Sequence, residues 1–134
     1  MDINQFLESI PKSFRPYFTR AYNAAVLGDG VGRSYVRHGA VLVDNKTIVS
    51  TGFNCRKTHP YLSKVTTFPF FHAESHAILR QGFETTPGMS LFVLRIRKTG
   101  HIGLSAPCNI CKAIIKMAGI KETWYSTESN VGRL

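Results

Sequence analysis

The chain has 134 residues, enough for one buried hydrophobic core but too few for two independent cores. Hydrophobic residues make up 43% and charged residues 19% of the sequence, a balance that excludes a disordered or collagen-like chain. The formal net charge of +9 favours phosphorylated or polyanionic partners, because a positive surface concentrates such ligands nearby. We expect a single domain over residues 1–134.

The N-terminal sequence MDINQFLESI has acidic side chains and no apolar run, which argues against a signal peptide. No stretch approaches the roughly 20 apolar residues that span a bilayer. The close pair Cys108 and Cys111 suits reduced thiols better than a disulfide framework. Cys55 is interpreted as an ordinary small residue, with an extra metal ligand or a reactive thiol as alternatives. These features predict a cytoplasmic protein.

The first predicted element is a helix with apolar residues at helical spacing, broken near Pro11 and Pro16. Glycines within residues 28–33 end it, because they destabilise any continuation of the helix. Residues 39–53 then contain two β-branched runs separated by a polar turn at 44–46, which predicts a hairpin.

The second half of the chain begins with residues 54–71, a segment without periodicity that predicts a long loop of a kind that is often functional. A helix over residues 72–81, a strand over 89–97, a helix over 108–117 and a strand over 122–126 follow. This order predicts an α/β fold: a mixed sheet of four to five strands, helices on both faces, and a right-handed crossover between the later strands.

Two short motifs, HAE at residues 72–74 and PCNIC at residues 107–111, stand at the predicted starts of helices. Together they form an H-x-E…P-C-x-x-C signature. Cys108 and Cys111 are three residues apart, so a helix directs both thiols to one face, where they can chelate one ion. Their place in the first helical turn is expected to lower the thiol pKa and favour the metal-binding thiolate.

His72 and Glu74 are two residues apart, a spacing that sends side chains to nearly opposite sides inside a helix. They can converge only at a helix start, where the first residue need not have helical dihedral angles. The three ligands His72, Cys108 and Cys111 would leave the fourth position of a tetrahedral zinc ion for water, as in catalytic sites. The sequence therefore predicts one zinc ion per chain, with Glu74 free to act as acid and base.

This residue set suits the hydrolytic removal of an amine from a base. Zinc lowers the pKa of a bound water from about 15.7 towards 7, which provides a nucleophile at neutral pH. The nucleophile attacks C4 of cytosine while Glu74 moves a proton from the water to ring N3 and then to the departing ammonia. A structural zinc site and an inactive domain are the alternatives.

Residues 38–126 resemble the cytidine/deoxycytidylate deaminase superfamily, which also includes tRNA adenosine deaminases and polynucleotide cytosine deaminases. The resemblance rests on HGAVLVDNKTIVSTGFN, HAESHAIL and SAPCNICKAIIKMAGIKETWYS. It implies a three-layer α/β/α deaminase-like fold, with zinc held by His72, Cys108 and Cys111 and with Glu74 as the proton shuttle. It also implies a homo-oligomer, either a dimer, a tetramer or a hexamer.

The resemblance further implies substrate contacts. Asn54 closes a T-G-F-N segment similar to the family's T-G-Y-N and is expected to contact the sugar or base, with a turn residue as the alternative. The following segment would form a substrate-binding edge that binds a phosphate, unless its charges are simply solvated. The basic candidates there are Arg56, Lys57 and His59. Ala73 and Pro107, inside the two motifs, are also expected to contact the substrate.

We predict a deaminase of a free cytosine nucleotide or nucleoside, with dCMP or CMP favoured because of the basic segment after Asn54. One alternative is a deaminase of cytosine or adenosine in single-stranded DNA or RNA, with Arg95 and Arg97 gripping the strand and phenylalanines before His72 stacking a flipped base. Another is a zinc-stabilised nucleic-acid-binding module without catalysis. No role is predicted for three further histidines, His38, His76 and His101.

Two features depart from the family pattern. Only eight residues, TESNVGRL, follow Ser126, so the later helix and strand of many family members are expected to be missing or replaced by this tail. The stretch RKTGHIGLSA, between the strand over 89–97 and the cysteines, is expected to fold back as a hairpin. Both departures leave the size of the substrate open.

Overall fold

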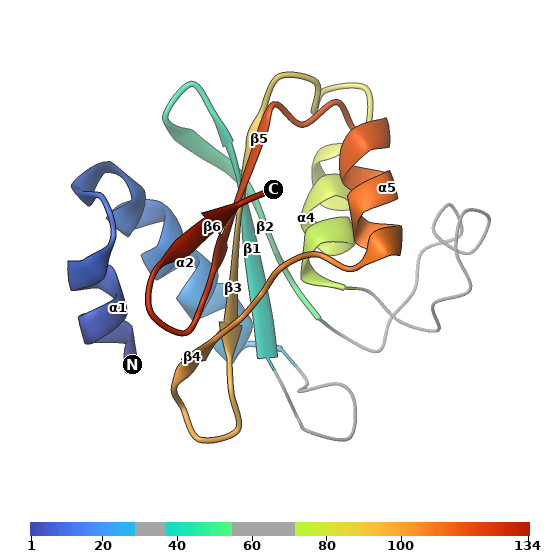
Figure 1. The fold of residues 1–134 in the computed structure, drawn as a ribbon. Helices are drawn as coiled ribbons and strands as arrows, with labels where there is room; N and C mark the ends of the chain where they lie inside the picture. The colour runs from blue at the N-terminus through green and yellow to red at the C-terminus, as the bar shows by residue number, and fades with distance from the viewer. Residues whose placement is uncertain (29–36, 55–71) are drawn as a thin grey trace.

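The computed structural model describes residues 1–28, 37–54 and 72–134. In these ranges a mixed sheet lies between two pairs of helices (Figure 1). The helical elements are α1 Ile3–Ser9, the 3-10 turn η1 Lys12–Phe14, α2 Arg15–Val26, α4 Ala73–Gln81 and α5 Asn109–Met117. The strands are β1 Arg37–Asp44, β2 Thr47–Phe53, β3 Ser90–Ile96, β4 Ile102–Gly103, β5 Glu122–Ser126 and β6 Val131–Arg133.

The sheet has the strand order β2-β1-β3-β5-β6, and β4 pairs with the end of β3. β3 and β5 are parallel and are connected through α5, whereas the other pairs are antiparallel. The α/β class and the mixed sheet are confirmed, but the described residues form six strands rather than four or five. The additional short strands are β4, within the predicted fold-back of RKTGHIGLSA, and β6, formed by the C-terminal tail.

Local sequence signals set the ends of several elements. Asn45 and Lys46 have φ angles of 48° and 70°, so they form the tight two-residue turn that joins β1 to β2. Pro16 lies in the first turn of α2, where its missing N–H costs nothing. The predicted helix break and hairpin are therefore confirmed.

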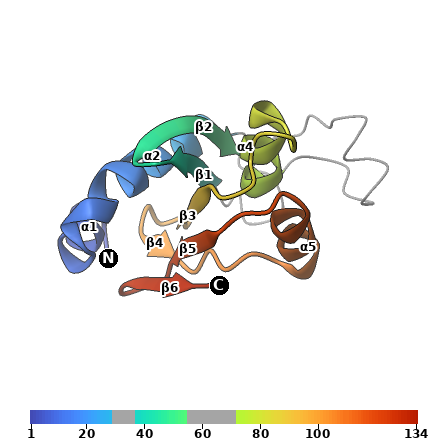
Figure 2. The ribbon, with the colours of Figure 1, turned by 90° about the horizontal axis from the view of Figure 1, so that it is seen from above.

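Alternation along the central strands divides the core into two layers. Val41 and Phe92 pack with the residues of α1 and α2, whereas Leu42 and Leu91 pack with those of α4 and α5. Figure 2 shows α2 and α4 on opposite sides of the strands. No helix in the described ranges is both long and apolar enough to span a bilayer.

α4 lies unusually close to β2, and this contact sets where the helix begins. A Cβ atom at Gly52 would lie 2.4 Å from the backbone nitrogen of Ala77 and 2.5 Å from the backbone oxygen of Ala73. Nδ1 of His76 lies 3.1 Å from both the backbone nitrogen and the backbone oxygen of Phe53. His76, for which no role was predicted, therefore ties α4 to the sheet.

The variant Gly52→Ala tests this contact. We expect it to lower the free energy of unfolding by about 1–3 kcal/mol, because the new methyl group would overlap the backbone of α4. Chemical denaturation followed by circular dichroism measures the change. Val49→Ala, at an exposed position of the same strand, is the control and should change the free energy by less than about 1 kcal/mol. Equal effects of the two variants would contradict the close packing.

Candidate active site

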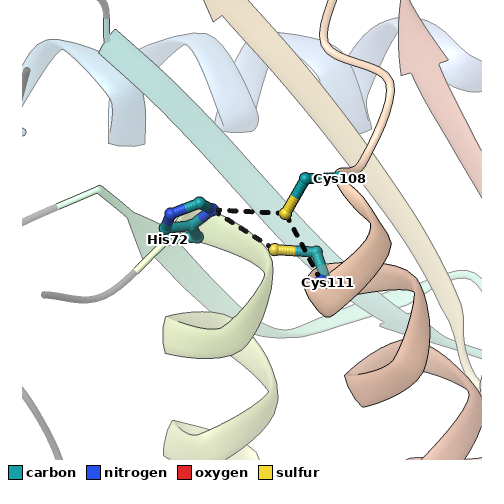
Figure 3. Close-up of side chains that lie close together, drawn as sticks. All are labelled: His72, Cys108 and Cys111. Carbon is teal, nitrogen blue, oxygen red and sulfur yellow. Dashed lines mark hydrogen bonds between the residues drawn. The ribbon is translucent and has the colours of Figure 1, made fainter. Parts of the chain in front are cut away.

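The three predicted metal ligands converge at the starts of two helices (Figure 3). Nδ1 of His72 lies 3.3 Å from Sγ of Cys111 and 4.0 Å from Sγ of Cys108, and all three atoms lie within 4.8 Å of one another. Zinc bonds of about 2.0–2.3 Å place tetrahedral ligand atoms roughly 3.5–3.8 Å apart. The donor atoms therefore fit around one zinc ion. Both thiols are free.

Capping geometry explains why these side chains meet. His72 is the N-cap of α4 and has extended dihedral angles, φ −86° and ψ 158°, so it need not follow the helical direction of Glu74. Cys108 is the N-cap of α5, and its Sγ accepts a hydrogen bond from the backbone nitrogen of Cys111 at 3.5 Å. The non-helical start predicted for the His72–Glu74 pair is confirmed.

The electrostatics of Cys111 differ from the sequence-based expectation. The helix start was expected to lower the pKa of the thiol, but burial raises it well above its usual range, and the charges of Glu74 and Cys108 raise it further. Desolvation of the thiolate at this buried position is the largest cause of the rise. Deprotonation of Cys111 therefore requires a nearby cation, which is what binding of a divalent metal ion supplies.

Glu74 is almost completely buried beside this ligand set, with 5% of its surface exposed. Burial raises the pKa of its carboxyl group, and hydrogen bonds to its own backbone and to Cys111 oppose that shift. A raised pKa makes a carboxyl group easier to protonate, which helps it to act as both acceptor and donor of a proton. The position and environment of Glu74 therefore suit proton transfer.

A cavity of about 310 Å³ adjoins the ligand set, a size within the range of small-molecule sites. Its lining comes from the ends of β1, β2 and β3, the start of α4 and the segment that leads into α5. The described residues that line it are His38, Asn54, His72, Ala73, Glu74, Arg95, Leu104, Ser105, Ala106 and Cys108.

Of the predicted substrate contacts, Asn54 and Ala73 line this cavity. Asn54 is buried, and its Oδ1 accepts a hydrogen bond from the backbone nitrogen of His38 at 2.9 Å. Pro107 is buried next to Cys108 but is not among the described lining residues. Its role in substrate binding stays a prediction. Several other candidates, Cys55, Arg56, Lys57, His59 and the phenylalanines at 68, 70 and 71, lie outside the described residues.

Two further residues, His38 and Arg95, line the cavity: no role was predicted for His38, and Arg95 was predicted to contact the substrate only under the polynucleotide alternative. They pair directly across β1 and β3. Burial lowers the pKa of His38 to about 4, and the charges of Arg95 and His72 add to this effect, so the imidazole is neutral at neutral pH. Both residues continue the alternation of core-facing positions in their strands, which is the signal that could have identified them.

Two buried serines attach the segment before Cys108 to the sheet. Ser126, at the end of β5, donates from its Oγ to the backbone oxygen of Gly103 at 2.7 Å and accepts from the backbone nitrogen of Arg95 at 3.2 Å. Its backbone nitrogen donates to Oγ of Ser105 at 2.8 Å. These bonds join β3, β4 and β5 at the point where the chain turns towards Cys108.

The sequence matches the family model of the cytidine and deoxycytidylate deaminase zinc-binding region over residues 14–127. The chain belongs to this family. The deaminase is accordingly a zinc-dependent hydrolase, and the resemblance seen in its motifs is confirmed. No curated protein sequence matches it.

Solved structures support the deaminase fold. The dCMP deaminase of cyanophage S-TIM5 is 25% identical, with a TM-score of 0.58 over 89% of this chain and 86% of the phage protein. The cytidine deaminase of Burkholderia pseudomallei is 21% identical, with a TM-score of 0.65 over 89% of each chain. The cytidine deaminase of Mycobacterium leprae is 18% identical, with a TM-score of 0.60 over 90% of this chain and 92% of that protein.

Zinc content tests the assignment of the ligands. Cys111→Ser should reduce the metal of purified protein from about one ion per chain to a small fraction, because it removes the buried thiolate from the ligand set. Inductively coupled plasma mass spectrometry measures the metal. Cys55→Ser makes the same change at the remaining cysteine and should leave the zinc content unchanged. Retention of zinc by Cys111→Ser would contradict the ligand assignment.

Proposed function

We propose that this deaminase converts the cytosine base of a free nucleotide or nucleoside to uracil with release of ammonia, and that it favours dCMP and CMP. The proposal rests on one observation: Glu74 and the predicted zinc ligands lie together at a cavity that Asn54 also lines. Membership of the cytidine and deoxycytidylate deaminase family supports it.

Different residues of the cavity would bind the metal and the substrate. His72, Cys108 and Cys111 would hold zinc, which when bound is a Lewis acid that makes water nucleophilic at neutral pH. Asn54 orients the sugar or base, because the hydrogen bond from His38 fixes its side chain. Ala73 would lie beside the base at the start of α4.

Glu74 moves the protons. Its carboxylate takes a proton from the attacking water and delivers it to N3 of the base while the new C4–O bond forms. It then transfers the second proton of the water to the exocyclic amine, and the C4–N bond breaks. One water is consumed, and the products are the uracil base and ammonia. The raised pKa of Glu74 suits this alternation between acceptor and donor.

The charge of the chain supports a phosphorylated substrate. Seventeen lysine and arginine residues against eight acidic residues give a positive field that attracts anions. The similar phage enzyme is a dCMP deaminase, which favours the same substrate class for this chain. The contribution of Arg56, Lys57 and His59 stays a prediction, because they lie outside the described residues.

The association of this deaminase with itself also stays a prediction. β2 is at one end of the strand order, and in the described part of the chain nothing pairs with its outer edge. Proteins commonly cover such edges, because unpaired backbone groups invite pairing with another chain. A homo-oligomer of the kind implied by the family resemblance could cover this edge. Light scattering on the purified protein would give its mass.

The variant Glu74→Gln tests the proton shuttle. We expect ammonia release to fall at least about 100-fold, because the amide keeps the shape of the side chain but cannot accept the proton. Zinc content and melting temperature should stay close to those of the wild type. Glu84→Gln, at an exposed position, is the matched control and should be fully active. Undiminished activity of Glu74→Gln would contradict the assigned role.

A substrate panel tests the choice of substrate. The purified protein is incubated with cytidine, deoxycytidine, CMP, dCMP, single-stranded DNA and tRNA, and ammonia is measured. We expect turnover of the free compounds, with a higher kcat/KM for the monophosphates than for the nucleosides. Conversion of polymers alone, with a rate that falls steeply as salt increases, would show that the proposal is wrong.

A further inference from the structure

Arg95 places a positive charge inside the active-site cavity. It lies in β3 directly opposite His38 of β1, and it lines the cavity together with Asn54 and Glu74. Val93, two residues earlier in the strand, packs in the core layer of α4 and α5. Alternation along the strand therefore turns Arg95 towards the face of the sheet that holds the metal ligands.

The guanidinium group has unused hydrogen-bonding capacity. Its Nη1 donates to the backbone oxygen of Leu104 at 3.4 Å, which is a long bond. Its Nε is buried and has no hydrogen-bond partner among the described residues. Buried donors are nearly always paired, and one without a partner is costly. Because Nε is shielded from bulk water, a ligand held in the cavity is the natural source of its acceptor.

Arg95 also differs from its neighbour Arg97. Arg97 pairs with Glu128, with 3.8 Å between Nη1 and Oε1, and half of its side chain is exposed. No carboxylate lies within 4.0 Å of the Arg95 guanidinium in the part of the chain that the structure describes. Of these two arginines, only Arg95 lines the cavity.

We propose that Arg95 binds the phosphate of the substrate, so that the enzyme selects a cytosine nucleoside monophosphate over the free nucleoside. The inference rests on the proposed function and deepens it. The planar guanidinium presents parallel N–H donors that match two phosphate oxygens, and its charge strengthens both hydrogen bonds. The weak bond to Leu104 can be exchanged as the side chain adjusts to the ligand.

Binding measurements isolate this role from catalysis. Zinc-loaded full-length Glu74→Gln protein is titrated with dCMP and with deoxycytidine in a calorimeter, because it should not consume either compound. Adding Arg95→Gln should weaken dCMP binding by about 10- to 100-fold and deoxycytidine binding by less than about threefold. Arg95→Lys should keep part of the dCMP affinity, because the charge remains but the paired donors are lost.

Arg97→Gln is the matched control. It removes the same charge two residues further along the chain, and Arg97 does not line the cavity. It should change both affinities by less than about twofold. Melting temperatures of all variants report whether they are folded. If Arg95→Gln fails to fold, the comparison of Arg95→Lys with the parent decides: an unchanged preference for dCMP would overturn the inference.

The outcomes separate this inference from the proposed function. Equal affinity of the parent protein for dCMP and deoxycytidine, or an equal loss of the two affinities in Arg95→Gln, would overturn the role of Arg95. Turnover of these compounds by the wild type would in that case still support the proposed cytosine deamination. Binding of single-stranded DNA that depends on Arg95, without a preference for dCMP, would assign the residue to a polynucleotide instead. If the protein neither binds nor converts any free cytosine compound, the role of Arg95 and the proposed function are both wrong.

Discussion

The metal site requires donor atoms from two helices to lie within one coordination sphere. His72 and Cys111 are 39 residues apart in the chain, yet their donor atoms lie 3.3 Å apart. The sheet makes this possible because it holds each helix start separately. The close approach of α4 to Gly52 fixes one start, and the buried hydrogen bonds of Ser105 fix the chain leading to the other.

Burial gives the site its chemical character. The pKa of both Glu74 and Cys111 is raised, because a buried charge loses the stabilisation that water provides. A divalent cation among the donors offsets this cost for the thiol, so metal binding and the ionisation of Cys111 are coupled. The carboxyl group of Glu74 is not among the three donors, and the same burial raises its pKa, as the proton transfer proposed for it would need.

Much of this arrangement could be predicted from local sequence. The proline breaks, the Asn45–Lys46 turn and the spacing of the two motifs are short-range signals, and they gave the elements and the converging ligands. β4 and β6 have two and three residues, too few for a periodic pattern. Alternation along β3 indicates which face of the sheet Arg95 occupies, but which helices cover that face, and therefore how deeply Cys111 is buried, depends on the packing of the whole chain.

The hydrogen bonds of the buried Ser105 and Ser126 also separate the tip of the β3–β4 hairpin from the candidate active site. Residues 97–101 are exposed, whereas Gly103, Ser105 and Ser126 hold the hairpin base to the sheet. Changes in the length or composition of an exposed tip are tolerated when the backbone at its base remains bonded. Protein engineers can therefore remodel this tip, for instance by grafting a peptide, while the bonds that hold the segment before Cys108 stay in place.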